Sequence, residues 1–86
     1  MRALRVVLSG EIDIYTASSA CRVLDAIDGP AVVDLSGVRL LTAAGLTELA
    51  RLANRVGHGI VTLAGARPQV CRILTLAQFD RLFTID

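Results

Sequence analysis

Short runs of aliphatic and β-branched residues recur along the chain and predict β-strands. Three such runs lie at residues 3–8, 31–35 and 60–64. The second run is nearly all apolar, which is typical of a strand covered on both faces of a sheet. A last apolar segment, residues 79–85, predicts a turn followed by an edge strand.

The first two runs are followed by residues that include Ser and Gly, 9–13 and 36–41, which are interpreted as loops. Between the strands, apolar residues recur three and four positions apart, the spacing of amphipathic helices. The predicted helices span about 17–27, 43–56 and 68–77. Alternating strands and helices indicate an α/β fold with about four mostly parallel strands, three helices and right-handed crossovers. At 86 residues the chain is expected to form a single domain, 1–86.

The helix ends carry recognisable signals. Thr16 and Thr42 precede the first two helices, where a hydroxyl can accept a hydrogen bond from an early backbone N–H. Pro68 suits the first position of the third helix, because its missing N–H has no helical partner there. Gly57 is expected to end the second helix.

Composition and charge exclude several classes of function. The chain is 53% hydrophobic with three aromatic residues and a net charge of +1, so neither a base-stacking platform nor a basic stripe for nucleic acid is expected. No apolar run approaches the roughly 20 residues of a membrane span, which favours a cytoplasmic protein without membrane insertion. With His58 the only histidine, no metal site is expected. Cys21 and Cys71 are interpreted as buried, reduced thiols.

Catalysis is not indicated either. Asp13 and Asp34 are the candidate acids at strand ends, but no nucleophile has a neighbouring base. Glycine-rich phosphate loops are absent, and only Arg39 stands where it could meet a phosphate, so no nucleotide or other cofactor is expected. We therefore expect a protein that is not an enzyme.

Residues 34–46 carry the strongest functional signal, a predicted strand end, a loop and a helix start. In open α/β sheets, ligands and partners bind beyond the carboxyl ends of the strands, and a helix start adds free N–H donors. Small residues there either let another surface approach the backbone or pack this segment against a neighbouring part of the chain. The predicted partner-binding residues are Asp13, Asp34, Ser36, Arg39, Thr42, Ala43, Ala44, Gly45 and Leu46.

This segment, DLSGVRLLTAAGL, resembles the signature of the STAS domain family, which includes the bacterial anti-sigma factor antagonists. The matching positions are Asp34, Leu35, Ser36, Val38, Leu41, Gly45 and Leu46. Residues 10–13, GEID, resemble the family's entry into its first helix, and residues 79–85 resemble its usual ending. The resemblance covers essentially the whole chain.

The resemblance implies a mixed sheet with helices mainly on one face, and a kinase-type anti-sigma factor as the partner. In the family's phosphorylated members, the partner phosphorylates a serine at the start of the second helix. Here Thr42 replaces the signature aspartate, Ala43 replaces that serine, and Ala44 replaces the following hydroxyl residue. Alanine has no hydroxyl, so this switch cannot operate at Ala43. The expected function is an anti-sigma factor antagonist-like binding module without the usual switch.

Several alternatives remain open at this point. A switch could have moved to Thr42 or Ser36. The chain also resembles stand-alone STAS proteins that serve as accessory subunits of ABC-type lipid transporters, and a scaffold in a signalling assembly is a further interpretation.

Family members usually carry another strand before the first one found here and a helix after the last. A bare sheet edge is therefore expected, which would allow a homodimer.

Overall fold

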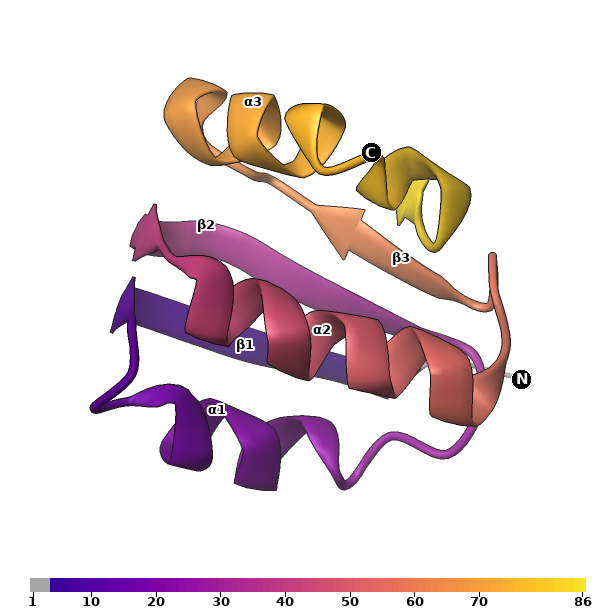
Figure 1. The fold of residues 1–86 in the computed structure, drawn as a ribbon. Helices are drawn as coiled ribbons and strands as arrows, with labels where there is room; N and C mark the ends of the chain where they lie inside the picture. Colours follow the sequence, from indigo (N-terminus) through magenta and orange to yellow (C-terminus); the bar gives the residue numbers. More distant parts are fainter. Residues whose placement is uncertain (1–3) are drawn as a thin grey trace.

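The computed structural model describes residues 4–86, so the predicted strand residue Ala3 lies outside the described residues. The chain alternates strands and helices in the predicted order (Figure 1). The elements are β1 (Leu4–Ile12), α1 (Ala17–Leu24), β2 (Ala31–Leu41), α2 (Ala43–Val56), β3 (Val61–Ala64), α3 (Pro68–Leu76), a 3₁₀ turn η1 (Phe79–Arg81) and β4 (Thr84–Ile85). The predicted α/β class, with four strands and three helices, is confirmed.

The strands form one sheet in the order β1-β2-β3-β4, and all three neighbouring pairs are parallel. Each connection leads to the next strand in the same direction across the sheet, and right-handed crossovers of this kind place every connecting helix on one face. Burial agrees with this arrangement, because Val33 and Leu63 face the helices and are fully buried. Val32 and Asp34 face the other side and are only half-buried, so the expectation that this strand is covered on both faces is wrong.

The first two strands are longer than the pattern predicts. β1 continues to Ile12 and β2 to Leu41, so most of residues 9–13 and all of 36–41 belong to the sheet and are not loops. The pairing shifts register twice, because β2 carries extra residues opposite β1. Gly37 fits at one shift, where a Cβ would stand 3.1 Å from the Ser9 Cβ. The polar residues of these stretches occupy the exposed side of an otherwise continuous ladder.

The first helix is shorter than predicted, ending at Leu24 and not at residue 27. A tighter turn follows, in which the Ile27 N–H donates to the Leu24 carbonyl, and the Ile27 side chain is fully buried. Arg55 of α2 donates to the carbonyls of Ile27 and Leu24 at 2.7 and 3.1 Å. A side chain from the neighbouring helix thus adds hydrogen bonds to the carbonyls at the end of α1 and in the turn that follows it.

The helices and the sheet share one hydrophobic core. Near the C-terminus of the chain, Phe79 and Phe83 stack with ring centroids 6.0 Å apart, and both are buried in this core. The predicted turn and edge strand over 79–85 are confirmed as η1 and β4. Cys21 and Cys71 are both free thiols, as predicted, but each is half-buried and not fully buried.

Candidate functional site

The start of α2 is attached directly to the end of β1. Thr42 stands at the N-cap position, as predicted, but its hydroxyl does not cap the helix. The hydroxyl donates to the Ile12 carbonyl at 3.0 Å, and the Thr42 N–H donates to the same oxygen at 3.0 Å. Thr42 therefore fixes where the second helix begins relative to the first strand, which the capping interpretation missed.

Gly45 allows α2 to lie close to the sheet. A Cβ at this position would stand 2.5 Å from the Leu41 Cδ1 and 2.8 Å from the Ile12 Cγ2. Gly45 is buried, so its small size serves this internal contact, which is the second of the two interpretations that the sequence left open for the small residues. Leu46 is half-buried and packs against the core.

Ala43 and Ala44 form the first turn of α2 together with Gly45. Ala43 is exposed and Ala44 is half-buried. No acidic side chain lies in this first turn, and Thr42 makes no side-chain cap, so the end of the helix retains free N–H donors and the positive end of its dipole. A partner can reach this turn at Ala43.

The loop between β1 and α1 lies beside the start of α2. Asp13 organises it, because one carboxylate oxygen accepts hydrogen bonds from the N–H groups of Tyr15 (2.9 Å) and Thr16 (3.1 Å). The Thr16 hydroxyl donates to the Glu11 carbonyl at 2.7 Å and accepts from the Asp13 N–H at 2.9 Å. Thr16 thus stabilises this loop and does not cap α1 through its side chain.

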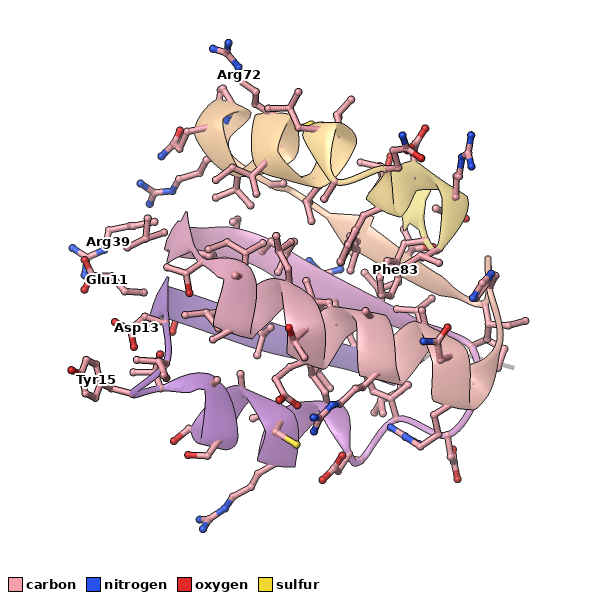
Figure 2. All side chains as sticks on the ribbon, in the orientation of Figure 1. Glu11, Asp13, Tyr15, Arg39, Arg72 and Phe83 are labelled. Atoms are coloured by element: carbon pink, nitrogen blue, oxygen red, sulfur yellow. The ribbon has the colours of Figure 1, made fainter. Side chains whose placement is uncertain are left out.

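This hydrogen-bonded loop presents two large apolar side chains to solvent. Ile14 is 76% exposed and Tyr15 is 88% exposed, more than any other large apolar side chain of residues 4–86. Figure 2 shows the Tyr15 ring projecting away from the body of the protein. Neither residue is among the binding residues predicted from the sequence, although two apolar residues between Asp13 and Thr16 that fit no strand or helix stripe were the available signal.

The end of β2 completes this surface. Arg39 is exposed, and Leu40 is 42% exposed. In Figure 2 the Arg39 and Glu11 side chains extend together beyond the carboxyl end of the sheet, near Asp13. We call this surface the docking end and define it as Ile14, Tyr15, Arg39, Leu40, Thr42 and Ala43.

Asp34 and Ser36 lie elsewhere, which corrects their expected place at the helix start. Because β2 is continuous, Asp34 is seven residues before Leu41, roughly 20 Å along the strand. It faces the side of the sheet that the helices leave open, and Arg5 contacts it at 2.6 Å. The predicted binding residues therefore form two groups, one at the docking end and one on the open face.

The group on the open face is a polar network. The pKa of Asp34 is lowered from its ordinary 3.8 to about 2, mainly by hydrogen bonds from the Ser36 hydroxyl and the Ser36 N–H. The hydrogen bond and the charge of Arg5 lower it further. Arg67 donates from Nε to the Ser36 carbonyl at 3.0 Å, which joins the start of α3 to β2. Gly65 approaches the same residue, since a Cβ there would lie 3.3 Å from the Ser36 Cβ. Asp34 and Ser36 of β2 are thus linked by side-chain hydrogen bonds to Arg5 of β1 and to Arg67 at the start of α3.

Among residues 4–86, no three His, Cys, Asp or Glu side chains come close enough together to hold a metal ion. The pKa of the Cys21 thiol is raised by hydrogen bonding to Glu48, by desolvation and by the charge of Asp25. A raised pKa lowers the thiolate fraction and hence the reactivity of the thiol. None of the helices in this part of the chain has both the length and the apolar character that crossing a bilayer requires.

Comparison with known proteins agrees with this architecture. The family model described as "Mlab, STAS domain" matches residues 1–84. The chain therefore belongs to the STAS domain family. A search among curated proteins found no match.

Proposed function

We propose that this STAS domain is a non-enzymatic binding module that docks a protein partner on its docking end, in the manner of an anti-sigma factor antagonist. The observation that carries the proposal is the exposed pair Ile14 and Tyr15, held by Asp13 beside the start of α2. Exposed aromatic and aliphatic side chains with a fixed backbone are suited to anchoring a partner, because little conformational entropy is lost when they are covered.

The proposed partner is a kinase-type anti-sigma factor, as the family resemblance implies. Ala43 occupies the exposed place at the start of α2 where the phosphorylated members of the family carry serine. Binding to such a partner would then be constitutive, because the partner could not end it by adding a phosphate at that position.

A switch at the neighbouring Thr42 is the less favoured variant of this proposal. Its hydroxyl is half-buried and already donates to the Ile12 carbonyl. A phosphate on that oxygen would break the bond that attaches α2 to β1. Ser36 is exposed but lies on the open face, apart from the docking end.

A second candidate is an accessory subunit of an ABC-type lipid transporter. The observation that favours it is the description of the matching family model, which names Mlab and not an anti-sigma factor antagonist. This candidate uses the same docking end, and the proposed partner becomes the nucleotide-binding subunit of the transporter.

Isothermal titration of the purified chain against each class of partner tests both candidates. We expect binding to a kinase-type anti-sigma factor from the same genome, and we expect Tyr15→Ala to weaken it at least about tenfold, as for an anchor at the centre of an interface. Leu76→Ala is the matched control, because Leu76 is an equally exposed apolar side chain (75%) at the far end of α3.

Three results would contradict the first candidate. Binding only to the transporter subunit, with the same dependence on Tyr15, would select the second candidate. Binding to neither class would refute the proposed function. Binding that Tyr15→Ala leaves intact while Leu76→Ala abolishes it would show that the partner docks elsewhere.

A further inference from the structure

The outer edge of β1 forms the floor of an open groove. β1 is the first strand of the sheet, and within residues 4–86 it pairs only with β2. Alternate N–H and C=O groups along its other side therefore point away from the sheet, where they can pair with another strand. The opposite edge strand, β4, has two residues and offers much less backbone.

The groove has a volume of about 390 Å³ and runs between this edge and α1. Its floor is the continuous stretch 7–12 of β1, and its wall is one side of the first helical turns: Thr16, Ser19, Ala20 and Val23. No residue of this wall is charged or larger than valine. Val23 is 38% exposed, so the wall offers apolar surface. A strand added to the β1 edge would lie against it.

We propose that the occupant of this groove is β1 of a second copy of the chain, antiparallel and centred on Leu8. The choice of occupant rests on charge complementarity. Arg5 and Glu11 are the only charged residues of β1, and each lies three positions from Leu8. Antiparallel pairing about that centre therefore places Arg5 opposite Glu11 of the partner subunit, and the two-fold axis repeats the pair.

The side chains of the strand are arranged to suit this register. Exposed Arg5, Val7, Ser9 and Glu11 alternate with the more buried positions between them, so Arg5 and Glu11 face the same side of the sheet. Gly10 has a positive φ of 77° without disturbing this alternation. Directly opposite residues of an antiparallel pair also face the same side, which is the condition for a contact across the axis.

The same register covers apolar surface that the single chain exposes. Leu4 is 46% exposed and would lie opposite Ile12 of the partner subunit, whereas Val7, at 59%, would lie opposite its Ser9. Arg5 already contacts Asp34 through one terminal nitrogen, and the guanidinium has further donors for a second carboxylate. One continuous sheet would then run through both copies.

This pairing leaves the docking end free. None of the docking-end residues belongs to β1, and antiparallel β1 strands point the carboxyl ends of the two sheets in opposite directions. The dimer would present one docking end at each extremity. The inference concerns a different surface from the proposed function and does not depend on it.

Analytical ultracentrifugation over a wide range of concentration tests the pairing. We expect the wild-type chain to dimerise. Glu11→Arg should raise the dimer dissociation constant about tenfold or more, because it sets two pairs of like charges opposite each other. Arg5→Glu should have the same effect. An equimolar mixture of the two variants should dimerise again, because both cross-strand pairs are then of opposite charge.

The control is Arg72→Glu, which makes the same charge change on an exposed residue of α3 and should leave dimerisation unchanged (Figure 2). Arg5→Glu also places a second carboxylate near Asp34, so its folding is checked by circular dichroism. If it does not fold, hydrogen exchange on the wild-type chain decides: amides of residues 4–12 should gain protection as concentration rises.

Two outcomes overturn the proposal. The first is a wild-type chain that stays monomeric at every concentration. If the β1 amides of such a chain became protected only when a heterologous partner was added, the groove would bind a strand of that partner. The second is a dimer that neither charge reversal weakens, because such a dimer does not use this register.

Discussion

Gly45 on α2 and Ile12 at the end of β1 are packed so closely that only hydrogen fits between them. A Cβ on Gly45 would stand 2.8 Å from the Ile12 Cγ2 and 3.1 Å from the Ile12 carbonyl oxygen. The Ile12 carbonyl also accepts both hydrogen bonds from Thr42. The residues that attach the second helix to the sheet thus also set the position of the docking end.

We predict that Gly45→Ala destabilises the fold. Alanine favours a helix over glycine by about 1 kcal/mol, but the added methyl group would overlap Ile12 and Leu41, and overpacking a core costs about 1–3 kcal/mol. The net loss of unfolding free energy, about 1 kcal/mol, is measured by urea denaturation. Gly29→Ala is the control, since nothing lies within 4 Å of a Cβ there. Equal stability of the two variants would contradict the packing argument.

The hydroxyl of Thr42 gives the second prediction. Thr42→Val keeps the shape of the side chain and removes its hydrogen bond to Ile12, which should cost about 1 kcal/mol of unfolding free energy. Thr42→Ser keeps a hydroxyl and should lose less. Urea denaturation compares the two. If Thr42→Val were as stable as the wild type while Thr42→Ser lost stability, the methyl group and not the bond to Ile12 would account for the contribution of Thr42.

The order of the elements could be predicted from the sequence because helix and strand periodicities are local. Helix α2 runs over the residues that its apolar stripe indicated, and β4 lies within the last apolar segment. The length of β2 could not be predicted in the same way. Residues 36–41 contain Ser, Gly and Arg, which resemble a loop, and only pairing with β1 shows that they continue the ladder.

That error in β2 had a consequence for the site. With a loop after residue 35, Asp34 and Ser36 were expected beside Thr42 at the helix start. The continuous strand separates them and places Asp34 on the open face with Arg5, a contact between residues 29 positions apart that no local pattern contains. Tyr15 was not predicted for a related reason, since sequence patterns select buried positions, and its proposed role rests on its exposure.

The Asp34 network predicts a pH dependence of stability. The pKa of Asp34 is lowered to about 2 in the folded chain, below its ordinary 3.8, so the unfolded chain binds a proton more readily. The stabilisation is complete above pH 4 and is lost as the pH falls toward 2. Urea denaturation between pH 2 and pH 5 should therefore show a steeper decline for the wild type than for Asp34→Asn.

Asp80→Asn is the control for that series, because Asp80 is an exposed aspartate on η1 and is not one of the groups that shift the pKa of Asp34. Its profile should follow that of the wild type. Parallel profiles for the wild type and Asp34→Asn would contradict the assignment. Carboxyl carbon shifts in NMR titrations give an independent reading of the Asp34 pKa.

The last prediction concerns the missing switch. Ala43→Ser restores a hydroxyl at the exposed first position of α2, where the helix dipole favours a phosphate. Incubated with ATP and a kinase-type partner, this variant should gain the mass of one phosphate and lose affinity for the partner. The wild type should gain none.

Ala50→Ser, on a half-buried position of the same helix, is the control and should stay unmodified. A phosphate found on the wild-type chain would show that the switch has moved to another hydroxyl. Phosphorylation of Ala43→Ser that left binding unchanged would place the partner away from the start of α2.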